Sequence, residues 1–120
     1  PYNVNGAAQA AALATLEDLA EAQANIAKII AERQRMMDKL GEIRFLHTYP
    51  SDANYILCRV SGIEVQSIKQ AMERRGIILR YFGSVDLVGF IRITVGTPMQ
   101  DESVLLTLRN LEQEGGNHAK

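Results

Sequence analysis

The chain has 120 residues, a formal net charge of −1 and 47% hydrophobic residues. This length suits one domain with one modest core, and the composition is ordinary for a globular protein. The near-zero net charge supplies no field that would attract nucleic acid or an anionic membrane, and the sequence has no run of 18 apolar residues. We therefore expect no nucleic acid and no membrane among its partners.

The single cysteine and the start of the chain bear on where the protein resides. Cys58 lies in an apolar run and has no second cysteine to pair with, which fits a reducing compartment and predicts a cytoplasmic location. Residues 1–5 show neither the basic region nor the apolar core of a signal peptide. Because the chain begins with Pro1 rather than methionine, we expect it to be either a processed chain or a piece of a longer protein.

Two helical segments are predicted first. Residues 6–22 are rich in alanine with leucines at three-residue spacing, and their small-residue face could pack within this domain or dock on a missing domain or subunit. Residues 24–40 carry an apolar stripe at helical spacing. Its members are Ile26, Ile29, Ile30, Met36, Met37 and Leu40, with Arg33 as the one interruption. The two segments could form one helix of about 50 Å or bend near residues 21–25.

The middle of the chain mixes short strands with one helix. We expect strands at residues 43–49, 53–60 and 77–82, and a helix at residues 64–75. The sequence Pro-Ser-Asp at residues 50–52 is a turn signal, Gly76 ends the helix, and Arg80 lies on the third strand. His47 stands alone, since no second histidine or cysteine lies at metal-ligand spacing, so the sequence predicts no metal site.

Residues 90–95 form the strand around which the rest of the chain is expected to be organised. Ile91, Ile93 and Val95 alternate along it and should share the face that packs on the core. Arg92 then points from mid-strand to the opposite face. There its planar fork of donors could grip a carboxylate or phosphate, or make a surface salt bridge.

The last helix is expected over residues 98–112. Thr97 is placed to cap its N-terminus, with Gln100 completing a capping box. Asp101 falls in the first turn, where the helix dipole favours a negative charge. Beyond this helix, the polar residues 115–120 are expected to fray.

The order of these elements indicates an α+β fold without regular βαβ repetition. We expect a small, mainly antiparallel sheet of three to four strands with helices on one face, preceded by a long N-terminal helical segment. The predicted division is a linker loop and connecting helix at residues 1–22, a small domain at residues 23–114 and a polar tail at residues 115–120. The other face of the sheet, with Arg92 and Arg80, would be open to a ligand or a second domain.

Four stretches carry a resemblance to a known family. They are Pro-Tyr-Asn-Val-Asn at residues 1–5, Pro-Ser-Asp-Ala-Asn-Tyr at 50–55, Gly-Ile-Ile-Leu-Arg at 76–80 and Phe-Ile-Arg-Ile-Thr-Val-Gly-Thr at 90–97. Together, and in this order, they resemble the C-terminal small domain of the histidinol-phosphate aminotransferases. These are pyridoxal 5′-phosphate (PLP) enzymes of fold type I, and the similarity covers essentially the whole chain.

This resemblance implies roles for three residues. Arg92 would bind the anionic group of the substrate: the carboxylate of glutamate or 2-oxoglutarate, and the phosphate of histidinol phosphate. Arg80 would assist with the same anion, and Asn54 would lie close to the site. The physical reading of Arg92 agrees, because a guanidinium held on a strand is preorganised to hold a charged end of the substrate.

The resemblance also implies that part of the machinery lies outside this chain. The family's Schiff-base lysine occurs in a Ser-x-Ser-Lys-like segment of a large domain, together with the groups that bind PLP. The four lysines here have no such context; they are Lys28, Lys39, Lys69 and Lys120. We therefore expect no catalytic residue in this chain, which would be inactive alone, and we expect a large PLP-binding domain and a homodimer partner.

Two alternatives remain open at this point. The same fold could belong to another fold-type-I enzyme, such as an aromatic aminotransferase or a threonine-phosphate decarboxylase. The chain could also be a stand-alone α+β module that binds a regulatory ligand on its open sheet face.

Overall fold

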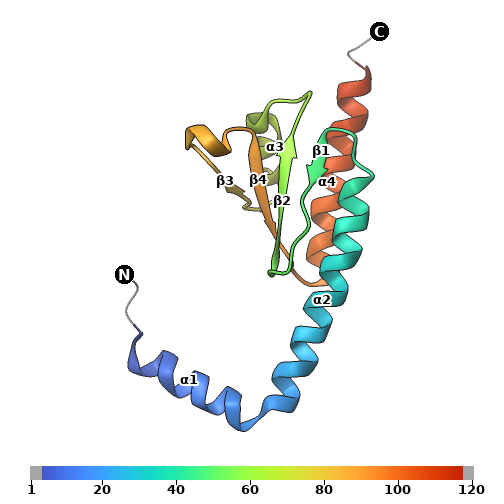
Figure 1. Cartoon of the computed structure of the whole chain (residues 1–120). Helices are drawn as coiled ribbons and strands as arrows, with labels where there is room; N and C mark the ends of the chain where they lie inside the picture. Colours follow the sequence, from blue (N-terminus) through green and yellow to red (C-terminus); the bar gives the residue numbers. More distant parts are fainter. Residues whose placement is uncertain (1–3, 118–120) are drawn as a thin grey trace.

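A computed structural model describes residues 4–117 of the chain (Figure 1). In chain order its elements are α1 (Gly6–Glu17), α2 (Leu19–Gly41), β1 (Leu46–Thr48), β2 (Tyr55–Val60), α3 (Val65–Glu73), β3 (Arg80–Tyr81), the short 3₁₀ helix η1 (Val85–Leu87), β4 (Phe90–Thr94) and α4 (Pro98–Asn117). The prediction of an α+β fold is confirmed.

The strands form one antiparallel sheet in the order β1-β2-β4-β3. Helices α3 and α4 cover one face of this sheet, and α2 runs beside α4 in the same direction (Figure 1). Ion pairs join these two parallel helices, among them Arg35 with Glu102 at 3.2 Å and Arg109 with Glu42 at 3.6 Å. The predicted arrangement, with helices on one face and the other face open, is therefore confirmed.

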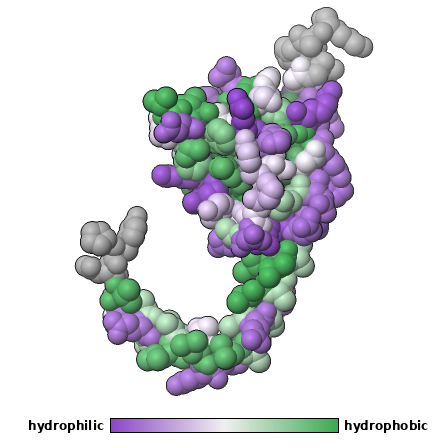
Figure 2. All heavy atoms as spheres, viewed as in Figure 1, coloured by the Kyte–Doolittle hydropathy of each residue, from purple (hydrophilic) through white to green (hydrophobic). Residues whose placement is uncertain are grey.

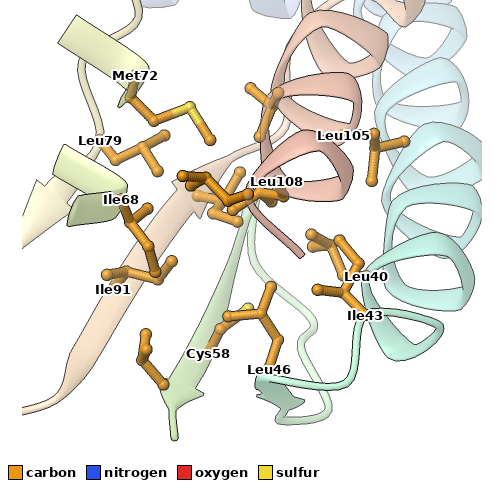
Figure 3. Packing of buried hydrophobic residues seen from close by; sticks show 14 of the residues in the cluster. Leu40, Ile43, Leu46, Cys58, Ile68, Met72, Leu79, Ile91, Leu105 and Leu108 are labelled. Atoms are coloured by element: carbon orange, nitrogen blue, oxygen red, sulfur yellow. The ribbon is translucent and has the colours of Figure 1, made fainter. Parts of the chain in front are cut away.

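The core lies between the sheet and its helices. The alternation predicted for the strand at residues 90–95 holds for Ile91 and Ile93, which are fully buried on the helix side. The strand ends at Thr94, however, and Val95 is only half-buried and lies outside the core cluster. Figure 3 shows Ile68 and Met72 of α3 projecting toward this layer of the sheet. The complete cluster comprises Met36, Leu40, Ile43, Phe45, Leu46, Ile56, Cys58, Val60, Ile68, Ala71, Met72, Leu79, Ile91, Ile93, Val104, Leu105, Leu108 and Leu111.

The break between the first two helices lies at Asp18, so the predicted bend near residues 21–25 and the alternative of one continuous helix are both wrong. Asp18 has non-helical backbone angles, φ −119° and ψ 66°. Its N–H still bonds the Ala14 carbonyl at 3.1 Å, while its carboxylate accepts the N–H of Glu21 at 3.4 Å. Aspartate is a preferred N-cap, and here it ends α1 and starts α2 without any glycine or proline.

Helix α1 and residues 19–30 of α2, which we call the N-terminal arm, extend away from the body of the domain (Figure 1). The predicted stripe of α2 is divided, because Met36 and Leu40 are buried whereas Ile26 is 55% exposed. Figure 2 shows hydrophobic residues gathered along this arm. The large exposed ones are Leu13, Leu16, Leu19, Ile26, Ile29 and Ile30. The arm thus presents apolar surface that this chain does not cover.

Several element boundaries differ from the prediction. The strand expected at residues 77–82 is reduced to β3, because the N–H of Ile77 bonds the Met72 carbonyl at the end of α3. Helix α4 continues to Asn117, beyond the expected end at residue 112 and through the glycines expected to fray. Glutamate and glutamine, both good helix formers, fill residues 112–114 and carry the helix on. Residues 1–3 and 118–120 lie outside the described part of the chain.

Candidate anion-binding face

Arg92 occupies the middle of β4, which lies between β2 and β3 in the sheet. Its cross-strand partners are Leu57 of β2 and Arg80 of β3. Residues that face each other across an antiparallel pair project to the same side of the sheet. Arg80 and Arg92 therefore stand side by side on the face opposite the core, as the sequence predicts.

The Arg92 side chain is half-buried and held against an aromatic ring. Its Cζ atom lies 4.9 Å from the centroid of the Tyr55 ring, which is within the range of a cation–π contact. Its Nε atom is buried and has no hydrogen-bond partner among the residues that the structure describes. Within the described part of the chain, no carboxylate forms an ion pair with Arg92. A buried charged donor without an acceptor is costly, and an anionic ligand would supply the acceptor.

Arg80 is more exposed and stacks loosely, with its Cζ atom 5.9 Å from the centroid of the Phe82 ring. It has no ion pair to any residue that the structure describes. Like charges directly opposite each other in a strand pair are destabilising. An anion placed between Arg80 and Arg92 would remove that repulsion, so the arrangement is suited to a ligand with one or two negative charges.

Asn54 lies just before β2, and its side chain is exposed. Its carbonyl accepts the N–H of Val95 at 2.9 Å, which extends the pairing of β2 with β4 by one residue. No hydrogen bond found among the described residues joins the Asn54 side chain to Arg92 or Arg80. The structure thus brings the two arginines together and leaves Asn54 at the margin of the face.

The turn before Asn54 is held by Arg33, whose role the sequence did not reveal. Its Nη1 atom donates to the Ala53 carbonyl at 3.0 Å, and its Nη2 atom lies 3.7 Å from the Asp52 carboxylate. Arg33, which interrupts the apolar stripe of α2, thus connects this helix to the Pro-Ser-Asp turn. The spacing within α2 alone carries no signal of this contact, because its partner lies 20 residues further along the chain.

Aromatic side chains extend the face toward β1. Tyr49 lies between His47 and Phe90, with ring centroids 4.9 Å and 5.9 Å away, respectively. The first contact is edge-to-face, which gives the lone histidine a structural role. No group of three or more His, Cys, Asp or Glu side chains in the described residues could hold a metal ion, and no described helix could span a membrane.

The turn that follows β4 is closed by two caps. The predicted capping box is present: the N–H of Thr97 donates to Gln100 Oε1 at 2.9 Å, and the N–H of Gln100 donates to Thr97 Oγ1 at 3.4 Å. The second cap has no local signal in the sequence. Asp101 is only 1% exposed, and its Oδ1 atom accepts the N–H of Gly96 at 3.0 Å. A Cβ atom at Gly96 would lie 2.8 Å from Gln100 Oε1, so glycine suits this position.

Comparison with known proteins identifies the family. The sequence model described as aminotransferase class I and II matches residues 1–108 of this chain. The chain belongs to the class I and II aminotransferase family.

Similar proteins within this family narrow the resemblance further. A histidinol-phosphate aminotransferase from Roseiflexus castenholzii is 40% identical over 114 residues, which cover 92% of this chain and 31% of the relative. The chloroplastic enzyme of that name from Nicotiana plumbaginifolia is 36% identical and is covered to 27% of its length. The chain thus spans about a third of the length of these aminotransferases.

Solved structures agree with the sequence relatives. The histidinol-phosphate aminotransferase from Clostridium acetobutylicum superposes with a TM-score of 0.83 at 25% identity, covering 95% of this chain and 35% of that one. A decarboxylase from Sulfurospirillum multivorans superposes with a TM-score of 0.72 at 23% identity, which shows the fold alone. The resemblance stated from the four sequence stretches is therefore confirmed.

Three lysines of this aminotransferase segment fall in the described residues, and all three lie on helices rather than on the sheet. The Nζ atom of Lys28 lies 3.4 Å from Asn25 Oδ1, and that of Lys39 lies 2.8 Å from the Glu42 carboxylate. Lys69 pairs with Glu73 at 3.9 Å. Each is engaged with a neighbour on or at the end of its own helix. Lys120 lies outside the described residues.

Proposed function

We propose that this chain is the substrate-anion-binding domain of a PLP-dependent aminotransferase that acts on histidinol phosphate and 2-oxoglutarate in histidine biosynthesis. The observation that carries the proposal is the half-buried Arg92 guanidinium, which has a buried Nε atom without an acceptor and stands in register with Arg80. The sequence relatives that bear the name histidinol-phosphate aminotransferase supply the reaction class.

In this proposal the two arginines do different work. Arg92, fixed by its strand and by the Tyr55 ring, presents a planar fork to the carboxylate or phosphate of the substrate. Arg80, which is more exposed, adds a second positive charge for a doubly charged group. Asn54 is proposed only as a neighbour at the edge of the site. Holding the anion in one place would orient the reacting amine and reduce the entropic cost of the reaction.

The cofactor and the rest of the enzyme are proposed to lie outside this chain. PLP supplies the electron sink that amino-group transfer requires. The three described lysines are engaged on helices, whereas the open sheet face offers cations for an anionic substrate. Residues 1–22 would connect this domain, residues 23–114, to a large PLP-binding domain of a cytoplasmic homodimer. The exposed apolar arm supports the existence of such a neighbour.

A titration with PLP tests whether this chain carries part of the cofactor site. We expect no saturable absorption band in the visible region when the purified chain is mixed with PLP, because none of the lysines has the sequence context of a Schiff-base lysine and the three described ones are engaged on helices. Equilibrium dialysis in parallel should detect no stoichiometric retention. A stoichiometric visible band that disappears in one of the lysine variants, Lys69→Gln for example, would contradict the proposal that PLP binds outside this chain.

A chimera tests the proposed reaction. The C-terminal segment of the Roseiflexus castenholzii enzyme that aligns with this chain would be exchanged for residues 1–120. We expect the chimera to bind PLP and to transfer the amino group of histidinol phosphate to 2-oxoglutarate, with the unmodified enzyme as the control. A folded, PLP-loaded chimera that prefers an aromatic amino acid, or that decarboxylates threonine phosphate, would favour one of the alternative fold-type-I functions.

A further inference from the structure

The buried carboxyl group of Asp101 is only half satisfied. Oδ1 accepts the N–H of Gly96, but Oδ2 is buried and has no hydrogen-bond partner among the described residues. A carboxylate oxygen without a donor in such a site loses its hydration and gains nothing in exchange. Some feature of the surroundings must therefore compensate Oδ2.

The group that faces this junction from α2 is another carboxyl, Glu32, which lines one cavity together with Gly96 and Gln100. Its proximity contributes to the raised pKa of Asp101, whose Oδ1 atom accepts the N–H of Gly96. The Glu32 side chain is only 10% exposed and already accepts from Arg35, with Nη2 to Oε1 at 2.7 Å and Nε to Oε2 at 3.1 Å. Two ionised carboxylates cannot hydrogen-bond each other, and like charges this close repel. One of the two groups must supply a proton for the contact to be favourable.

The remaining charged groups around the pair do not reach Oδ2. Arg35 is shared between Glu32 and Glu102. Lys28 lines the cavity of about 800 Å³ beside Glu32, but its Nζ atom is bonded to Asn25. Arg75, at the end of α3, lines the cavity of about 400 Å³ next to Asp101 and donates to Thr107 Oγ1 at 3.2 Å. Among the residues that the structure describes, no other group donates to Oδ2, so a proton on the carboxyl group itself would complete the arrangement.

We propose that at mildly acidic pH Asp101 carries a proton on Oδ2 and donates it to the Glu32 carboxylate, so that one shared proton links the turn after β4 to α2. The direction of the proton follows from the surroundings. Burial raises the pKa of Asp101 to about 6, and the neighbouring Glu32 carboxylate adds to the increase despite the opposing Gly96 N–H. Hydrogen bonding to Arg35 lowers the pKa of Glu32, which makes Glu32 the acceptor.

This contact makes Asp101 a positioning residue for the candidate anion-binding face. Residues 96–101 connect β4, which carries Arg92, to the first turn of α4. Asp101 thereby ties the end of β4 both to its own helix and to α2. Loss of the shared proton would leave two facing negative charges at this junction and would loosen the turn without removing any side chain of the binding face.

The pH dependence of stability has a definite sign. The pKa of Asp101 is about 6 in the folded state, compared with its ordinary value of 3.8. Folding therefore takes up a proton at pH values between these two. Its contribution to the free energy of unfolding is fully present below pH 3.8 and is lost as the pH rises through about 6. The pKa of Glu32 is lowered in the folded state, so its contribution to the free energy of unfolding is lost as the pH falls, at more acidic pH than the Asp101 transition. Stability should thus fall between pH 5 and pH 8.

The direct test is a titration of the side-chain carboxyl ¹³C resonances in the full 120-residue chain. We expect the Asp101 carboxyl to titrate with a midpoint of about 6. In Glu32→Gln the midpoint should fall toward the ordinary aspartate value, because the amide removes the negative charge and can donate. Glu102→Gln, which alters an exposed partner of Arg35, is the matched control and should leave the midpoint near that of the unchanged chain. A midpoint at or below the ordinary value in the unchanged chain would overturn the proposal.

A substitution supplies an independent test. Asparagine at position 101 reproduces the protonated acid, since its oxygen can accept from Gly96 and its amide can donate to Glu32. We expect Asp101→Asn to match the unchanged chain in melting temperature at pH 5 and to lose most of the decrease between pH 5 and pH 8. Asp101→Ala should melt lower at both pH values. If asparagine proves as damaging as alanine, or the pH dependence survives in Asp101→Asn, no proton is shared.

Discussion

Replacing Arg92 by alanine in the chimeric aminotransferase is expected to lower kcat/KM for glutamate and for histidinol phosphate by roughly 30- to 5,000-fold. This range corresponds to the loss of about 2–5 kcal/mol when one partner of a buried, hydrogen-bonded charge pair is removed. The effect should be large because the guanidinium is half-buried beside the Tyr55 ring and has an Nε donor without an internal acceptor. Steady-state kinetics with each substrate varied in turn would measure it.

Two further variants make this test specific. Arg92→Lys keeps the charge but loses the fork, so it should recover only part of the activity. Arg59→Ala is the matched control, because Arg59 lies on the same sheet face, in register with His47 and Phe90, but is exposed. We expect its kcat/KM to stay close to that of the unmodified chimera. Unchanged kinetics with glutamate in Arg92→Ala would remove Arg92 from the site.

The largest effect on stability is expected from Leu108→Ala. Leu108 is fully buried on α4 within the cluster shown in Figure 3, and truncating a buried leucine costs about 2–5 kcal/mol of unfolding free energy. The same helix offers a control in Leu106, which is 50% exposed. Leu106→Ala should change the unfolding free energy by no more than about 0.5 kcal/mol.

Urea unfolding of the two variants, followed by circular dichroism, would measure both values. The denaturant dependence of the free energy should be the same in each, because the surface exposed on unfolding hardly changes. Equal losses at positions 106 and 108 would mean that α4 does not pack on the sheet as described.

The parts of the fold that the sequence predicted are those governed by local periodicity. Alternation at residues 90–95 placed Ile91 and Ile93 in the core and Arg92 on the opposite face, because successive strand residues must point to opposite sides. The capping box at Thr97 was predictable for the same reason, since its partners lie three residues apart. The sequence placed Arg80 and Arg92 on separate strands, whereas their direct alignment comes from the pairing of β3 with β4 in the structure.

The features that were missed depend on contacts far apart in the chain or on competition between local preferences. Asp101 was expected only to be a residue of the first turn that complements the helix dipole, whereas the fold buries it next to Glu32 of α2. In the sequence Arg33 is only an interruption of an apolar stripe, and its contact with the Ala53 carbonyl is seen only in the folded structure. At Asp18, a strong capping preference prevails over an alanine-rich sequence that favours an unbroken helix, and composition alone does not decide between them.

The facing arginines of β3 and β4 have a consequence for the stability of this domain with and without the proposed anion. Their mutual repulsion lowers the free energy of unfolding of the empty domain, and an anion that binds only the folded form restores it by mass action. Neutralising Arg80 should therefore raise the free energy of unfolding of the empty domain and weaken its affinity for the anion. Such a change exchanges function for stability. A substrate anion bound between the two arginines, as proposed, would therefore stabilise the sheet as well as undergo the reaction.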